Sequence, residues 1–147
     1  MARSSCTGEA EPLQNFQAFE IRITIAQMIE TRSRWLSQTP LVPTGGTIAE
    51  SIAFYTQQLG FTVDWEGGNM AGIRRDDVCF NLVESTNKEW IANSSISIGV
   101  TDLDAFYQEI KSIKGKISPP TLRPWGRREL HIILPSGVCL QFYQQNG

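Results

Sequence analysis

Residues 47–60, TIAESIAFYTQQLG, form the clearest single element of the chain. Apolar side chains recur there at helical spacing and share one face of the predicted helix: Ile48, Ile52, Tyr55 and Leu59. Thr47 is a residue type that caps helix N-termini, and Gly60 is a type that ends helices. The stretch therefore predicts an amphipathic helix with defined ends.

Short strand-like segments surround this helix. PLV (40–42) precedes it, and FTVDW (61–65), MAGIRR (70–75) and DVCFNLVE (77–84) follow it. The segments EGGN and RDD between the later strands are typical of turns. This half of the chain therefore predicts the order β-α-β-β-β.

The second half of the chain repeats that order. SISIGV (95–100) predicts a strand, and TDLDAFYQEIKSIKG (101–115) predicts a helix capped by Thr101 or Asp102 and ended at Gly115. KIS (116–118), RRELHIIL (127–134) and GVCLQFY (137–143) predict the later strands.

Two short matches occupy equivalent places in the halves. AFY recurs in both helices (53–55 and 105–107), and VCFNL (78–82) matches VCLQF (138–142) in the last strand of each half. Such matches indicate an internal duplication. We therefore predict an α+β fold for residues 40–147, with two βαβββ modules (40–92 and 93–147). Their strands form a curled mixed sheet around a cup-shaped cavity, with the helices outside.

Residues 1–39 form an N-terminal extension of uncertain structure. Every second residue from 19 to 25 is apolar, as in a strand, whereas residues 26–36 suit a helix. The extension packs on the main domain or on a partner chain, or three of its apolar side chains plug the cup: Phe16, Phe19 and Met28.

Composition indicates a folded domain. The chain has 147 residues, of which 41% are hydrophobic and 19% charged, unlike disordered chains. No apolar run reaches the roughly 20 residues that span a membrane. Three cysteines without metal-type spacing favour the reducing cytoplasm. Residues 40–110 hold ten acidic and three basic residues, which argues against nucleic acid as a partner.

Five segments carry a resemblance to a known family: ESIAFYTQQLGF (50–61), AGIRRDDVCFNLVES (71–85), ISIGVTDLDAFYQEI (96–110), RPWGRRELHI (123–132) and LPSGVCLQFY (134–143). They resemble the vicinal oxygen chelate superfamily of glyoxalases, bleomycin resistance proteins and extradiol dioxygenases, and most of all the bleomycin resistance proteins. The resemblance covers about residues 40–145. It implies paired βαβββ modules and a homodimer whose clefts are built from both chains.

Enzymes of this superfamily hold a metal ion with side chains from the first strand of each module and from the final strand. The resemblance places Pro40, Ser95 and Gln141 at those positions, and Asn81 at a fourth position that some glyoxalases use. Proline has no side-chain donor, and neutral hydroxyls and amides are poor ligands for zinc or nickel. The sequence therefore predicts neither a metal site nor a cofactor.

Other catalytic groups are also sparse. Glu129 and His131 lie two residues apart and share a strand face, but a catalytic metal normally needs three protein ligands. Cys79 and Cys139 lie in mid-strand without a neighbouring base, which favours packing over nucleophilic catalysis. We therefore predict that the protein is not an enzyme.

Alternation along the strands predicts which side chains line the cup. If Gln141 points into the cup, as its equivalents do in the related enzymes, residues at period two share its face. Carried across the strands, the same logic predicts this lining: Cys79, Asn81, Val83, Ser95, Ser97, Gly99, Cys139 and Tyr143. Such small and neutral groups suit a ligand held by shape and hydrogen bonds.

The PWG segment (124–126) resembles the loop that borders the ligand groove of bleomycin resistance proteins. Pro124 and Gly126 shape the backbone around Trp125, so we expect the indole to be held rigid and presented to a flat ring. Trp65 and Met70 match other groove positions, and Trp90 adds a further wall.

Charged residues near the groove support two kinds of ligand. Asp64, Glu66 and Glu84 suit a cation, whereas Arg123 and Arg127 favour an anion. The adjacent Arg128-Glu129 matches an Arg-Glu pair of the family, and we expect that pair to be structural.

These observations together predict a dimeric, cytoplasmic protein that binds a small, partly aromatic molecule and confers resistance by sequestering it. A cationic glycopeptide antibiotic of the bleomycin class is the first candidate, and neither a membrane nor nucleic acid is an expected partner. The predicted ligand-binding residues are Trp65, Met70, Asn81, Trp90, Ser95, Ser97, Trp125, Gly126, Gln141 and Tyr143. The alternative is a glyoxalase-like lyase, epimerase or thiol transferase with an atypical metal site.

Overall fold

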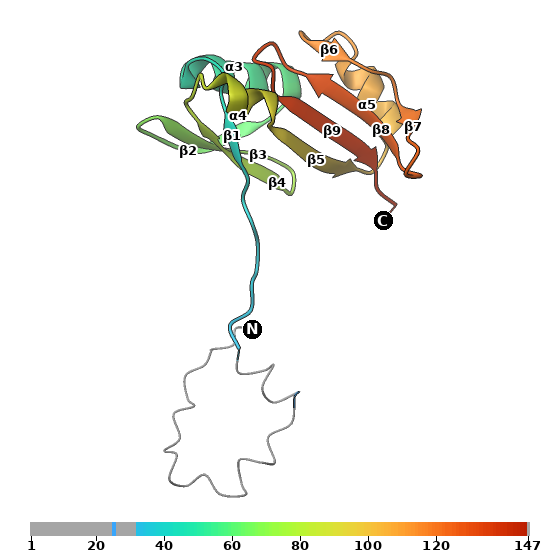
Figure 1. Cartoon of the computed structure of the whole chain (residues 1–147), viewed down its shortest axis with the longest axis horizontal. Coiled ribbons are helices and arrows are strands. Elements are labelled where there is room, and N and C mark those ends of the chain that lie inside the picture. Colours follow the sequence, from blue (N-terminus) through green and yellow to red (C-terminus); the bar gives the residue numbers. More distant parts are fainter. Residues whose placement is uncertain (1–24, 26–31, 147) are drawn as a thin grey trace, which may run out of the picture. The chain divides into compact units, whose positions relative to one another are not determined.

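The computed structural model describes residue 25 and residues 32–146 of the chain. Thr39–Gly147 form one compact unit, distinct from Met1–Gln38, and the helices and strands labelled in Figure 1 belong to it. Among the described residues, no helix has the length and apolar character needed to cross a membrane.

The extension differs from its predicted structure where it is described. Residues 33–36 have no regular structure, so the helix predicted over 26–36 is wrong at its C-terminal end. Trp35 and Leu36 are exposed and bury no apolar face, which a short helix needs for stability. Ile25 has helical rather than strand conformation. The predicted plug residues lie outside the described residues: Phe16, Phe19 and Met28.

Module one has the predicted order of elements. It contains β1 (Leu41–Pro43), α3 (Ile48–Leu59), β2 (Thr62–Gly67), β3 (Met70–Arg75) and β4 (Val78–Val83). β1 runs parallel to β4, and the remaining neighbours are antiparallel, in the sheet order β1-β4-β3-β2.

Local sequence accounts for α3. The Thr47 hydroxyl accepts a hydrogen bond from the Glu50 N–H, and the Glu50 carboxylate accepts one from the Thr47 N–H, which forms a capping box. Gly60 ends the helix at a φ of 71°, in the left-handed region that glycine adopts without strain. The buried Tyr55 ring contacts the rings of Phe61 and Phe80 edge-on, so α3 covers one face of the sheet.

Module two repeats this arrangement. It contains β5 (Ser95–Val100), α5 (Leu103–Ile110), β6 (Lys116–Ile117), β7 (Thr121–Leu122), β8 (Arg128–Ile133) and β9 (Cys139–Gln144). The sheet order is β5-β9-β8-β6, with β7 also paired to β8, and β5 runs parallel to β9. The predicted α+β fold of two βαβββ modules is confirmed, with the strands divided between a sheet of four and a sheet of five.

Details of the second module differ from prediction. Asp102, one of the two predicted caps, is the N-cap of α5, but the helix ends at Ile110 rather than near Gly115. Gly115 does not end the helix but lets the chain pass the Ile133 carbonyl, which a Cβ would approach to 2.7 Å. α4 (Lys88–Ala92) and β7 were not predicted, because elements this short show no periodic pattern.

Each module has one face covered by its helix and one open face. The covered faces hold fully buried side chains, including Ile73, Phe80, Leu82, Leu130, Ile132 and Leu140. Phe142 packs against Phe106 of α5 with ring centroids 4.5 Å apart. The opposite faces carry the residues predicted to line the cup, so the division between core and lining follows the predicted alternation.

Candidate ligand-binding site

The open face of module two consists of side chains from three adjacent strands. The register pairs Ser97 with Gln141 and Gln141 with His131, and one step along it pairs Gly99 with Tyr143 and Tyr143 with Glu129. Because paired residues in neighbouring strands point to the same side of a sheet, this face is made of Ser95, Ser97, Gly99, Glu129, His131, Ile133, Cys139, Gln141 and Tyr143. Glu129 is the single carboxylate among these residues.

That carboxylate, Glu129, is buried with 1% of its surface exposed. Its Oε2 accepts hydrogen bonds from Trp125 Nε1 at 3.0 Å and from Arg127 Nε at 2.7 Å. His131 Nε2 lies 3.0 Å from Oε1, and because an ionised carboxylate only accepts, that nitrogen carries the proton. Arg123 Nε is more distant, 3.9 Å from Oε1.

Electrostatics determines the charge of Glu129. Burial disfavours its ionised form, but hydrogen bonds from Trp125, His131 and Arg127 outweigh that effect and lower the pKa of Glu129 to about 2. The group is therefore a fixed negative charge at neutral pH, and it anchors the loop that carries the indole.

Trp125 is held at one end and exposed at the other. Its indole N–H donates to Glu129, yet 65% of the residue surface is accessible. The loop around it is closed by hydrogen bonds from Gly126 N–H to the Arg123 carbonyl and from Arg123 N–H to the Arg127 carbonyl. Gly126 adopts a φ of 86°, which a side chain would strain. The loop therefore presents a restrained, solvent-facing aromatic ring.

A second aromatic side chain lies on the same face. The Tyr143 ring crosses over Gly99, where a Cβ would come within 3.0 Å of it. The Arg127 guanidinium stacks over that ring at 4.1 Å and donates from Nη2 to Ser97 Oγ at 3.2 Å. Arg127 therefore links Glu129, Tyr143 and Ser97 into one group.

The open face of module one has a comparable aromatic platform. The register pairs Trp65 with Gly72 and Gly72 with Asn81. A Cβ at Gly72 would overlap the Trp65 indole, so this glycine lets the ring lie across the sheet while 45% of the tryptophan stays exposed. Met70 shares the face, whereas Trp90 lies on α4.

The predicted ligand-binding residues thus fall into two groups and one outlier. Module one brings together Trp65, Met70 and Asn81, and module two brings together Ser95, Ser97, Trp125, Gly126, Gln141 and Tyr143. Trp90 stands apart on its short helix. The role of Glu129 as the centre of the module-two group was missed, although its spacing from His131 placed both on one face.

Two of the three acidic residues predicted to attract a cation have other partners, and the third, Glu66, lies on the strand face opposite to Trp65. Asp64 pairs with Arg74 at 3.0 Å. Glu84 accepts a hydrogen bond from Ile48 N–H at the start of α3. Arg128, which with Glu129 matches an Arg-Glu pair of the family, makes two hydrogen bonds to Asp104, which lower the pKa of that carboxyl. The Arg-Glu pair on this face is therefore Arg127-Glu129.

The metal positions of the superfamily do not fit a metal here. Pro40 contributes only its carbonyl, which accepts a hydrogen bond from Asn81 N–H. Ser95 and Gln141 are neutral, and both hydrogen-bond to Cys139. Within residues 25 and 32–146, no three His, Cys, Asp or Glu side chains are grouped so as to hold an ion. His131 and Glu129 pair with each other instead.

Cys139 is not an activated nucleophile. Burial raises the pKa of its thiol, and hydrogen bonds from Gln141 and Ser95 only partly oppose this. At neutral pH the residue is therefore a thiol, the unreactive form.

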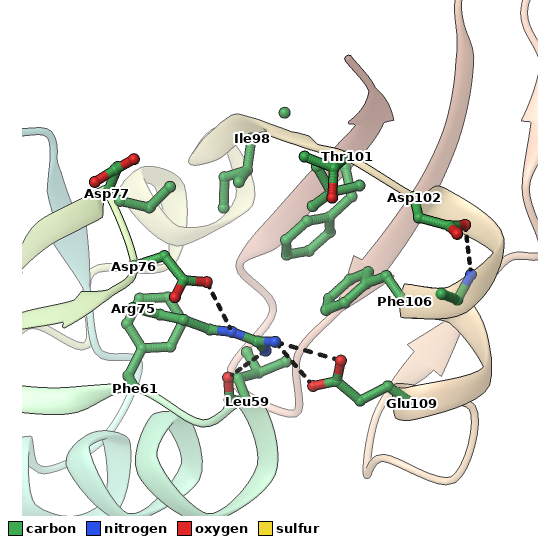
Figure 2. Close-up of a pocket in the computed structure, with 15 residues that line it drawn as sticks. Leu59, Phe61, Arg75, Asp76, Asp77, Ile98, Thr101, Asp102, Phe106 and Glu109 are labelled. Atoms are coloured by element: carbon green, nitrogen blue, oxygen red, sulfur yellow. Dashed lines mark hydrogen bonds and ion pairs between the residues drawn. The ribbon is translucent and has the colours of Figure 1, made fainter. Parts of the chain in front are cut away.

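A cavity of about 390 Å³ lies beside α3 and α5. Its apolar wall includes Phe61 and Phe106, and Arg75 crosses one side to reach the Leu59 carbonyl at 2.9 Å and Glu109 at 3.0 Å (Figure 2). None of the ten predicted ligand-binding residues lines it. The sequence could not indicate it, because its walls come from several separate elements.

Comparison with known proteins gives matches that cover the two modules. The family model of the Glyoxalase/Bleomycin resistance protein/Dioxygenase superfamily matches residues 41–142. A bleomycin resistance protein of Geobacillus stearothermophilus is 28% identical over 130 residues, which cover 75% of this chain and 97% of that protein.

Two solved structures share the fold. A bleomycin-binding protein complexed with bleomycin has a TM-score of 0.68 and 22% identity, covering 76% of this chain and all of that one. The bleomycin-binding protein of bleomycin-producing Streptomyces verticillus, complexed with copper(II)-bleomycin, has a TM-score of 0.69 and 24% identity, covering 77% and 98%.

Proposed function

The chain belongs to the Glyoxalase/Bleomycin resistance protein/Dioxygenase superfamily, and on that premise we propose that it sequesters a small, partly aromatic antibiotic without altering it. Sequestration requires tight binding at defined stoichiometry and no reacting side chain. The first candidate ligand is a glycopeptide of the bleomycin class, because the relative from Geobacillus stearothermophilus is a bleomycin resistance protein.

The observation that carries this proposal is the way Trp125 is presented. Its indole is fixed at one end by the buried Glu129, and most of the ring remains in solvent. A flat ring can stack on such an aromatic with little further loss of conformational entropy. Ser97 and Gln141 supply neutral hydrogen-bonding groups on the same face.

The enzyme alternative is supported only by the wider superfamily. Its lyase, epimerase or transferase chemistry would need a metal site, and the positions that supply it are Pro40, Ser95 and Gln141. The donor set of these three residues is unsuitable for zinc or nickel. The groups that do converge on the open face of module two suit recognition, so we favour binding.

The two platforms lie on different sheets, which supports a dimer in the proposal. Trp65 belongs to module one and Trp125 to module two. In the family, a cleft combines modules from two chains, which would bring one platform opposite the other. We therefore include a homodimer, located in the cytoplasm, in the proposed function. Sedimentation analysis that gives a monomer at micromolar concentration would remove the dimer from it.

Tryptophan fluorescence tests the proposal. Bleomycin, metal-free and copper-loaded, is titrated into the full chain, and saturable quenching at about one ligand per chain is expected. Trp125→Ala should abolish most of the saturable quenching. Trp35→Phe is the matched control, because Trp35 is 96% exposed and lies in the extension; its titration should be unchanged. Linear quenching with no saturation, identical in all three proteins, would refute the proposal.

A further inference from the structure

We propose that the open face of module two contains an anion subsite formed by Arg123 and Arg127, so that its ligand combines a flat ring with a carboxylate or a similar oxyanion. This inference rests on the proposed function, since it concerns the same face. A protein with this subsite differs from one that selects its ligand by the ligand's positive charge.

The charges beside Trp125 do not balance. Two guanidinium groups, of Arg123 and Arg127, lie around one ionised carboxylate, that of Glu129. His131 adds no negative charge in either protonation state. Glu129 is 1% exposed, whereas the side chains of Arg123 and Arg127 are 24% and 41% exposed. The accessible part of the group is therefore cationic, with one positive charge left uncompensated.

Arg123 has a donor that is left unpaired. Arg123 Nε is buried and has no hydrogen-bond partner among the described residues, because 3.9 Å to Glu129 is too long for a hydrogen bond. A buried polar group without a partner carries a free-energy penalty. The other guanidinium nitrogens of Arg123 also make no hydrogen bond to a described residue, and the side chain is 24% exposed, so it can donate to a ligand oxyanion.

Arg127 is the more exposed of the two and is held in position. Nε donates to Glu129 and Nη2 to Ser97, while the guanidinium plane stacks on Tyr143. Nη1 makes no hydrogen bond to a described residue. A fixed guanidinium with a free N–H is suited to planar oxyanions, because little side-chain entropy is lost when it binds them.

The acidic residues predicted to attract a cation are paired or lie on another strand face. Asp64 is paired with Arg74, and Glu84 accepts a hydrogen bond at the start of α3. Glu66 lies on the strand face opposite to Trp65. On module two the carboxylate nearest Trp125 is Glu129, which lies beneath the groups that bind it. The exposed surface around the indole therefore attracts negative rather than positive charge.

Three probes that share a naphthalene ring separate stacking from charge. They are 2-naphthoate, 2-naphthalenemethanol and 2-naphthylmethylammonium, titrated into the full chain by calorimetry at low ionic strength. Naphthoate should bind about tenfold more tightly than the alcohol, and the ammonium more weakly than the alcohol. Added salt should weaken naphthoate binding and leave alcohol binding unchanged.

Adjacent arginines supply a matched pair of variants. Arg127→Gln should remove the preference for naphthoate, so that on this variant naphthoate and the alcohol bind with equal affinity, a loss of about tenfold in their ratio. Arg128→Gln removes the same charge from a residue that pairs with Asp104 away from Trp125 and should retain the naphthoate preference. If Arg127→Gln does not fold, Arg127→Lys keeps the charge without the planar fork and should show an intermediate loss.

The outcomes distinguish the two proposals. Equal affinity for all three probes, or equal losses in the two arginine variants, would overturn the anion subsite even if bleomycin binds. Conversely, a naphthoate preference that depends on Arg127 in a chain that does not bind bleomycin would support the subsite and reject the drug assignment. Tighter binding of the ammonium than of naphthoate would overturn the subsite directly.

Discussion

Replacing Glu129 by glutamine tests whether one buried carboxylate organises the loop that carries Trp125. A pKa of about 2 against an ordinary value of 4.5 corresponds to about 3 kcal/mol in favour of the folded, ionised state. The covering side chains of Arg127 and Trp125 are partly exposed, so solvent screening reduces this value. We expect Glu129→Gln to lower the free energy of unfolding by about 2 kcal/mol at pH 7.

The pH dependence has a defined sign. The pKa of Glu129 is depressed in the folded state, so its contribution to stability is fully present above about 4.5 and is lost as the pH falls toward about 2. The difference in unfolding free energy between the unaltered chain and Glu129→Gln should therefore be constant from pH 7 to about 5. Less than half of it should remain at pH 3.

Urea unfolding, followed by circular dichroism at several pH values, measures this difference. Asp104→Asn is the control, because it breaks a solvent-exposed pair with Arg128 and should leave the unfolding midpoint almost unchanged. Trp125 fluorescence should shift to longer wavelength in Glu129→Gln as the indole loses its anchored position. Equal stability of Glu129→Gln and the unaltered chain at pH 7 would refute the reasoning, as would a difference that persists undiminished at pH 3.

Other substitutions test neighbouring parts of the account. Gly72→Ala should displace the overlying Trp65 indole, lower the free energy of unfolding by about 1 to 3 kcal/mol and increase acrylamide quenching of that indole. Gly67→Ala, whose added Cβ would meet no neighbour within 4 Å, should change neither the stability nor the quenching. Equal stability and equal quenching in the two variants would contradict the packing of Trp65 over Gly72. Arg75→Gln should cost about 1 to 2 kcal/mol in urea unfolding, because Arg75 joins the end of α3 to α5. Arg74→Gln removes an exposed pair and should cost no more than about 0.5 kcal/mol; a larger loss there than at Arg75 would show that the bridge between modules is unimportant.

Much of the fold could be predicted because local signals agreed with one another. Thr47, Glu50 and Gly60 set the ends of α3, and period-two alternation separated the buried Leu140 and Phe142 from the open-face residues. The duplication then supplied the module order. The end of α5 was misjudged because Gly115 has a tertiary role, its passage beside Ile133, and no local pattern distinguishes that role from a helix terminator.

The candidate site was only partly predictable. A rigid Trp125 followed from its flanking residues, but the role of Glu129 depends on four side chains that converge on it from the loop and from β8. Burial of a carboxylate beneath its own neighbours has no sequence signature. The pairing of Arg128 with Asp104 was likewise not predictable, because it joins β8 to a helix that is distant in sequence.

Calorimetric titration of bleomycin into the full chain, followed by chromatographic recovery of the ligand, shows whether the protein binds the drug and leaves it unaltered. We predict saturable binding of about one ligand per chain, with every molecule of the antibiotic recovered unchanged after prolonged incubation. Conversion of the ligand to a new product would contradict sequestration without catalysis, and the absence of any binding heat up to high micromolar ligand would contradict the drug assignment itself.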